Sequence, residues 1–234
     1  MEGVSGSTKV SRPEGLARLI EALHGEIVLR YVAGARVVDL GHGAPEIARW
    51  AAEVAESWTV SEPTKWQIDP RGAITLPLPD RAFDVTVVLR TLPHVGVDPE
   101  SSHLGARTLL AEAARITAPG GHVLVEIDNP RSLRGLAQGL LHRRTVVRTN
   151  VLPAEGRGVD RFDTLRGLLA LAPPHLEFVR VHAARTLVSL ARALDLPVLG
   201  RLIARAEWWA RDAPILRRLG AHLLVVLRRQ EEAS

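Results

Sequence analysis

The sequence predicts an α/β protein with a mostly parallel sheet, and two observations support this fold class. Segments with apolar residues at helical spacing alternate with short apolar runs typical of buried strands. Glycine and proline separate these segments. Alternation of this kind usually places helices against a layered, largely parallel sheet. A chain of 234 residues suits one such domain, or one domain with a cap.

The first half of the chain supplies most of the expected elements. Apolar residues spaced mostly by three and four predict a helix over 13–31. Further helices are expected from Pro45, because proline suits a first helical position, and from Ser102, which can cap a helix ending before Pro119. The expected strands are 36–41, 57–61, 83–89 and 122–127.

The C-terminal third is less regular. A loop is expected at 151–160, where a proline and two glycines interrupt the pattern. The helices expected here are 130–141, 162–171 and a run of short helices over 187–219 broken at Pro197 and Pro214. The expected strands are 176–181 and 221–227.

Composition excludes several classes of protein. The chain has no cysteine, which removes disulfides, thiolate nucleophiles and cysteine-ligated metal sites. The histidines lack metal-ligand spacing, so no metal site is expected. No apolar run reaches about 18 residues, the length of a spanning helix, and the first residues lack the apolar core of a signal peptide. We therefore expect a soluble cytoplasmic protein.

Charge is distributed unevenly along the chain. Residues 131–234 hold 18 arginines, no lysine and nine acidic residues, a net charge of +9 within a total of +4. Such a region can attract an anionic substrate, nucleic acid or a membrane surface. The arginines are spread out, however, which favours a solvated helical surface. Aromatic residues make up only 4% of the chain and offer few stacking platforms for single-stranded nucleic acid.

The first candidate binding segment joins the opening strand to its helix. Its sequence is Val38-Asp-Leu-Gly-His-Gly-Ala-Pro45. Glycines after a buried strand let a ligand approach the backbone, and the next helix begins with free N–H groups. Glu62 follows Asp39 by 23 positions, where an acidic residue can bind a ribose diol. A tight turn without a ligand would explain the glycines equally well.

Four segments in order resemble the class I S-adenosylmethionine-dependent methyltransferases, in particular the large small-molecule subgroup. They are VVDLGHG at 37–43, LPLPDRAFD at 76–84, LPH at 92–94 and LLAEAARITAPGG at 109–121. The resemblance covers about residues 15–128. It implies a Rossmann-like seven-stranded sheet with an antiparallel last strand, helices on both faces and a helical C-terminal cap. Within a single domain of 1–234, residues 1–130 would bind the cofactor and 131–234 would form the substrate cap and last strands.

The resemblance also implies roles for individual residues around an S-adenosylmethionine cofactor. Asp39 would face its amino end, and Glu62 would accept hydrogen bonds from its ribose. The remaining predicted contacts are the turn residues Gly41, His42 and Gly43, with Leu76 against the adenine and Leu89 and Arg90 beside the sulfonium.

The chain departs from the family pattern at two places. Pro45 replaces the third glycine of the turn and removes one backbone N–H. The acidic residue that the family often places near the adenine is missing, since Gly72 and Ala73 occupy that region. Asp69 lies nearby, about three positions away.

Methyl transfer needs a general base only if the acceptor must lose a proton. The candidates near expected strand ends are His94, His103, Asp128 and His142. His94 is the first choice, because it follows the strand that faces the transferred methyl group in the resembled family. A packing histidine at the start of a helix is the alternative interpretation.

The sequence thus predicts S-adenosylmethionine-dependent methyl transfer to a small-molecule acceptor on O, N or C. Trp208 and Trp209 lie in an arginine-rich segment that the family uses as a cap, so the acceptor would be apolar or anionic. A helix packed on the sheet is the structural alternative. Two other functions stay open: a methyltransferase-like partner subunit or regulator without transfer activity, and a nucleic-acid methyltransferase suggested by the basic C-terminal third.

Overall fold

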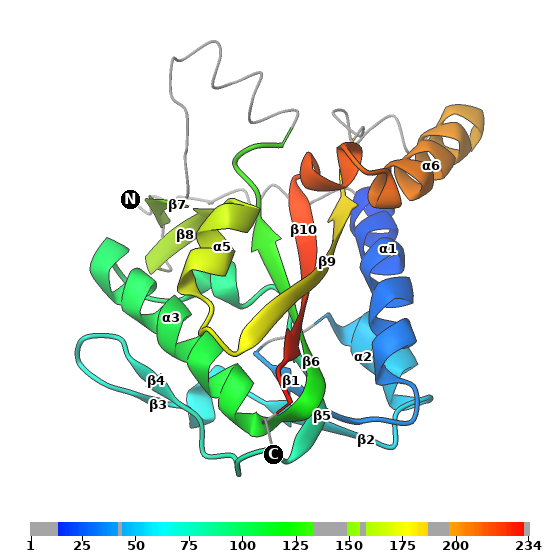
Figure 1. The fold of residues 1–234 in the computed structure, drawn as a ribbon. Coiled ribbons are helices and arrows are strands. Elements are labelled where there is room, and N and C mark those ends of the chain that lie inside the picture. Colours follow the sequence, from blue (N-terminus) through cyan, green and yellow to red (C-terminus); the bar gives the residue numbers. More distant parts are fainter. Residues whose placement is uncertain (1–13, 42–43, 133–148, 155–157, 187–196, 232–234) are drawn as a thin grey trace, which may run out of the picture.

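The computed structural model describes residues 14–41, 44–132, 149–154, 158–186 and 197–231 (Figure 1). Six strands form the main sheet, in the order β2-β1-β5-β6-β10-β9. They are β1 (Arg36–Leu40), β2 (Ser57–Ser61), β5 (Phe83–Val88), β6 (Thr117–Asp128), β9 (Leu176–Ala184) and β10 (His222–Arg229). The helices are α1 (Glu14–Val32), α2 (Pro45–Ala52), α3 (Pro99–Ile116), α5 (Leu165–Leu171) and α6 (Pro197–Asp212).

The register of the sheet confirms a mostly parallel arrangement with an antiparallel last strand. β1 lies parallel to both β2 and β5, so Asp39 is flanked by Val60 and Val87. β5 and β6 are also parallel. β10 runs antiparallel to β6 on one side and to β9 on the other. The carboxyl ends of β1, β2, β5 and β6 therefore share one edge of the sheet.

Two buried apolar clusters hold the helices against the sheet. Leu109 and Leu110 of α3 pack with Val125 and other residues on one face, which α5 also covers. On the opposite face, Ile27 of α1 packs with Leu224 and with residues of α2. Figure 1 shows these two helical layers on either side of the sheet. The layers bury the continuous apolar runs of β5, β6 and β10 on both faces, as expected for strands inside an α/β sheet.

The main sheet holds six strands among the described residues, one fewer than the seven implied by the family resemblance. The short strand β4 (Ile74–Thr75) pairs instead with β3 (Gln67–Ile68) in a separate antiparallel pair. Side chains of α3 accept hydrogen bonds from backbone N–H groups in and just after β4. The Ile74 N–H donates to Thr108 Oγ1 at 2.9 Å, and the Leu76 N–H donates to Glu112 Oε2 at 2.7 Å.

The predicted start of α3 was wrong by several residues. Asp98, not Ser102, caps the helix: its carboxylate accepts from the backbone N–H groups of Glu100 and Ser101, and the Ser101 hydroxyl accepts from the Asp98 N–H. This capping box gives partners to backbone N–H groups at the start of the helix that have none within it. Ser102 lies inside the first turn, too late in the chain to do this. Ser102 is instead buried inside the helix.

The predicted loop at 151–160 was also wrong, because most of it forms a hairpin. β7 (Thr149–Ala154) pairs antiparallel with β8 (Gly158–Asp163). α5 then begins at Leu165, where the Thr164 hydroxyl accepts from the Gly167 N–H at 3.0 Å, so it starts three residues later than expected.

Other expectations concern the rest of the C-terminal third. The helix expected at 130–141 lies outside the described residues from 133 onward. α6 begins at Pro197 and ends at Asp212, which agrees with the breaks expected at Pro197 and Pro214, while residues 187–196 lie outside the described residues. No helix in the described parts of the chain is long and apolar enough to cross a bilayer.

Candidate functional site

A cavity of about 390 Å³ opens beside the carboxyl ends of the parallel strands. Pro63 and Trp66 line it from the segment after β2, and Ile74 lines it from β4. Thr91 and His94 line it from the segment after β5. Its volume lies within the range of small-molecule sites, and open α/β sheets bind their ligands at this edge.

Asp39 carries a strongly perturbed carboxyl group near this edge. Its side chain is on β1 and only 2% exposed, and its Oδ1 has no hydrogen-bond partner among the described residues. Burial raises the pKa of Asp39 from 3.8 to about 7. An unpartnered buried carboxyl with a raised pKa is typical of a binding site, because a cationic ligand can supply the missing partner.

Thr91 fills the space beside Gly41, directly after β1. Gly41 has a φ of +128°, and a Cβ there would lie 1.8 Å from Thr91 Oγ1. The Thr91 hydroxyl lies 2.9 Å from the carbonyl oxygen of Leu40 and donates to it. Glycine at 41 is therefore required by the neighbouring side chain as well as by the backbone. His42 and Gly43 lie outside the described residues.

The first turn of α2 lacks a side-chain cap. Ala44 occupies the N-cap position, and Pro45 begins the helix. The N–H groups of the first turn of a helix have no partner within the helix. These N–H groups, beside the β1 turn, suit the negative end of a ligand.

Of Glu62, Leu76 and Asp69, only Asp69 lines the cavity. Glu62 is exposed directly after β2, and Leu76 is buried in the core outside the lining of the cavity. Asp69, which the sequence placed about three positions from the family's adenine acid, does line the cavity. The Ala73 and Arg71 N–H groups donate to Asp69 Oδ1 at 2.8 and 2.9 Å and hold its pKa below the ordinary value.

Leu89 and Arg90 follow β5, which ends at Val88, one residue earlier than expected. Leu89 is buried in the cluster under α1 and α2. Arg90 has a φ of 55°, lines the cavity and donates to Glu21 Oε1 of α1 at 2.9 Å. A positive φ at a residue other than glycine is strained, and such strain gathers at functional sites.

His94 lies at the end of the 3-10 helix η2 (Leu92–His94), and the hairpin brings an acidic partner to it. His94 Nδ1 is 3.2 Å from Asp160 Oδ1 of β8. Arg161 fixes the hairpin: it is 1% exposed, its Nε lies 2.5 Å from Asp163 Oδ2, and its Nη1 donates to the Ser102 carbonyl at 3.2 Å. Sequence reasoning missed Asp160, because the segment was expected to be a loop.

The other proton-transfer candidates are placed less favourably. His103 is exposed on α3, and His142 lies outside the described residues. Asp128 is engaged by His222, whose Nδ1 lies 2.7 Å from Asp128 Oδ1. No group of three or more potential metal ligands occurs in the described ranges.

The tryptophans expected in the cap belong to α6. Trp209 is 70% exposed. The Arg211 guanidinium lies 5.2 Å from the Trp208 ring, while Arg211 also binds Glu26 of α1 at 2.8 Å. The described part of α6 therefore packs on α1 through Arg211 and leaves Trp209 at the surface.

Comparison with solved structures defines the class of fold. The chain is similar to a protein from Listeria monocytogenes described as an S-adenosylmethionine dependent methyltransferase, at 14% identity over 93% of this chain and all of the other, with a TM-score of 0.53. It is also similar to an S-adenosylmethionine dependent methyltransferase from Mesorhizobium loti, at 19% identity over 89% and 97% of the two chains, with a TM-score of 0.48. No protein-family model and no curated protein matches the sequence.

The chain has the fold of the class I S-adenosylmethionine-dependent methyltransferases, as the sequence predicted. Another similar structure is a 1,6-didemethyltoxoflavin-N1-methyltransferase from Burkholderia thailandensis with bound S-adenosylhomocysteine. It is 12% identical over 93% of this chain and 79% of that chain, with a TM-score of 0.48.

Proposed function

We propose that this protein transfers a methyl group from S-adenosylmethionine to a small-molecule acceptor on O, N or C. The observation that carries the proposal is the buried, unpartnered carboxyl of Asp39 at the carboxyl edge of a methyltransferase-type sheet. The amino group of S-adenosylmethionine is a cation that suits this carboxyl group. The cavity after β2 and β5 has room for the nucleoside end.

Most of the predicted donor contacts keep their roles in this proposal. Asp39 binds the amino group, and the uncapped N–H groups of α2 bind the carboxylate. Glu62 binds the ribose. Trp66 and Asp69 line the cavity and replace Leu76 as the proposed adenine contacts. His42, Gly43, Leu89 and Arg90 remain predicted contacts.

S-adenosylmethionine supplies a methyl group on a positively charged sulfur, so the protein chiefly has to position the acceptor. His94 lines the cavity and has Nδ1 against Asp160, which leaves Nε2 as the atom that removes a proton from the acceptor. Asp160 is a positioning residue: its carboxylate, with Oδ1 3.2 Å from Nδ1, orients the imidazole ring. In this division of labour, residues 1–130 bind the donor and residues 131–234 help to form the acceptor side.

Calorimetric titration with S-adenosylmethionine and S-adenosylhomocysteine tests the donor site. We expect saturable binding by the natural sequence and a loss of about tenfold or more in the Asp39→Asn variant, since one charged hydrogen bond is worth about 1.5–3 kcal/mol. Glu53→Gln, exposed at the C-terminal end of α2, is the matched control and should bind normally. Absence of binding at millimolar ligand would favour the partner-subunit or regulator function instead.

The acceptor side is tested with S-adenosylmethionine carrying a radioactive methyl group. The label should enter the low-mass fraction of a cell extract and not its RNA or DNA. His94→Gln should lower this transfer by about 100-fold or more while donor binding is unchanged. Asp160→Asn should lower the rate less, again with unchanged donor binding. Label confined to nucleic acid would contradict the small-molecule acceptor.

A further inference from the structure

Helix α6 has its charged side chains on the inside and large apolar side chains on the outside. Glu207 is 0% and Arg211 is 3% exposed, whereas Trp209 is 70% and Leu202 is 58% exposed. A helix at the surface of a globular protein normally has the opposite polarity, with its apolar side against the core. Packing within this fold therefore does not explain the apolar residues on the outer side of α6.

The inward charged residues fix the rotation of α6 about its own axis. The Glu207 carboxylate accepts a hydrogen bond from the Thr186 N–H at 2.9 Å. Arg211 donates to Glu26 Oε2 of α1 at 2.8 Å and to Asp212 Oδ2 at 2.9 Å. Breaking bonds of this kind leaves a buried charge without a partner, which is strongly unfavourable. The helix therefore cannot turn over to bury its tryptophans.

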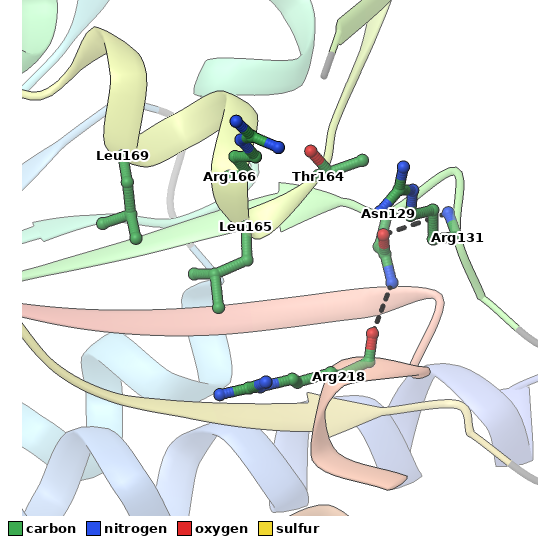
Figure 2. A pocket seen from close by; sticks show the side chains of 7 residues that line it. All are labelled: Asn129, Arg131, Thr164, Leu165, Arg166, Leu169 and Arg218. Atoms are coloured by element: carbon green, nitrogen blue, oxygen red, sulfur yellow. Dashed lines mark hydrogen bonds between the residues drawn. The ribbon is translucent and has the colours of Figure 1, made fainter. Parts of the chain in front are cut away.

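The segment that follows α6 is also fixed. It contains the 3-10 helix η4 (Leu216–Arg218). Asn129 Nδ2, at the end of β6, donates to the carbonyl oxygens of Arg218 and Gly220 at 3.0 and 2.9 Å. Figure 2 shows the bond to Arg218, beside a second cavity of about 350 Å³. Because α6 is held on its inner side and the chain after it is held to the sheet, its outer side is a preformed surface.

Four exposed residues make up this outer surface, which we call the α6 face: Leu202, Arg205, Trp208 and Trp209. At 3.6 residues per turn, their positions span about 120° around the helix axis, so they share one side of the helix. Figure 1 shows α6 at the margin of the fold, beside the end of α1 and extending away from the sheet. Exposed apolar residues that gather on one side of a helix in this way are typical of an interaction site.

The charge available on the α6 face is positive. Arg205 is exposed and has no acidic partner among the residues that the structure describes. Asp212, which is also exposed, is already paired with Arg211 and lies 2.5 Å from His182 Nδ1. Residues 131–234 as a whole carry a net charge of +9. A partner that complements this face is therefore both apolar and negatively charged.

From these observations we propose that the α6 face docks this protein onto the surface of an anionic lipid bilayer. Tryptophan favours the head-group region, because its ring is apolar and its N–H is polar. Leu202 inserts beside the indole rings, and Arg205 lays its aliphatic stem along them with its guanidinium at the lipid phosphates. The inner side of α6 stays on α1, so the helix lies in the interface. This inference goes beyond methyl transfer and does not require that S-adenosylmethionine binds.

Flotation of the full chain with lipid vesicles tests this docking. The protein should float with phosphatidylcholine vesicles that contain phosphatidylglycerol, and it should float less with phosphatidylcholine alone. Added salt should weaken the binding to the anionic vesicles. No flotation with the anionic vesicles, or equal flotation with both kinds, would overturn the proposal.

Substitutions locate the contact on α6. Trp209→Ser and Leu202→Ser change exposed side chains, so both variants should fold, and each should weaken vesicle binding about tenfold or more. Arg205→Gln should weaken it about fivefold. Val54→Ser after α2 and Arg107→Gln on α3 also change exposed residues, and as matched controls they should change binding by less than about twofold. Equal weakening by the controls would contradict docking through the α6 face.

A second copy of the chain is the other occupant to be tested. Sedimentation equilibrium without vesicles should show no association that depends on Trp209. A dimer that Trp209→Ser dissociates would show that the face is a subunit interface and would overturn the proposal. Lipids with brominated acyl chains should quench the tryptophan fluorescence of the bound protein. Trp209→Phe should still float but be quenched less, and equal quenching of both proteins would count against insertion of Trp209.

Discussion

Replacement of Asp39 by asparagine should make the folded protein more stable at alkaline pH. The Asp39 carboxyl is buried, and its pKa is raised from 3.8 to about 7. Between these two values the folded protein holds a proton that the unfolded chain has released. Stability from this group is therefore complete below pH 3.8 and is lost as the pH rises to 7. A difference of roughly three pKa units corresponds to about 4 kcal/mol of unfolding free energy.

Asparagine has nearly the same shape and never ionises. The Asp39→Asn variant should therefore match the natural sequence near pH 4 and exceed it by up to about 4 kcal/mol near pH 8. Urea denaturation at a series of pH values measures this difference directly. Other titrating groups, such as His24, contribute equally to both proteins and largely cancel in the comparison.

Two results would refute this reasoning about Asp39. A stability difference that does not change with pH would show that the carboxyl has an ordinary pKa and a partner. A variant less stable at pH 8 would show that the carboxylate is already paired in the free protein. The donor should remove the effect, since its amino group supplies the counter-charge: S-adenosylmethionine binding near pH 6 should release a proton from the natural sequence and none from Asp39→Asn.

Three further perturbations test the remaining physical arguments. Burial lowers the pKa of His24 from 6.5 to about 3, so the unfolded chain binds a proton that the folded one does not. Urea denaturation should show stability falling as the pH drops from 6.5 to 3, by up to about 5 kcal/mol, and His24→Gln should flatten that slope. Gly41→Ala should lower the free energy of unfolding by about 3 kcal/mol or more, because its Cβ would collide with Thr91. Gly34 also has a positive φ but open space around it, so Gly34→Ala should lower it by only about 1–2 kcal/mol. Thermal unfolding of the two variants measures the difference. Arg161→Gln should lower the free energy of unfolding by about 3–5 kcal/mol, because it leaves Asp163 buried without its charged partner. A loss below about 1 kcal/mol is typical of an exposed ion pair and would contradict this argument.

The strands and helices predicted correctly from the sequence are those whose apolar pattern agrees with their burial. β5 and β10 are buried on both faces and read as continuous apolar runs. α1 and α3 carry apolar residues at helical spacing because each faces the sheet on one side. Local residues determine these elements, so local patterns predict them.

The hairpin could not be predicted because its inward side chains are charged. Along β8 the buried residues are Val159, Arg161 and Asp163, alternating with half-buried ones. This is the period of a strand, but the buried positions include an ion pair, which an apolar pattern cannot detect. The partner that makes such burial tolerable, the Ser102 carbonyl, is 59 residues away in the sequence. Asp160 lies on this hairpin, so it was missed, whereas His94 was predicted from its place after β5.

Pro45, the main departure from the family pattern, is compatible with the proposed donor site. Proline at the first position of α2 removes an N–H that the helix does not use, and its fixed φ suits a helix start. The N–H groups of the next two residues remain, and the methyl group of Ala44 cannot accept a hydrogen bond from them. At the start of the same segment, Thr91 fills the space beside Gly41. Proline at position 45 therefore leaves in place the N–H groups that are proposed to bind the donor carboxylate.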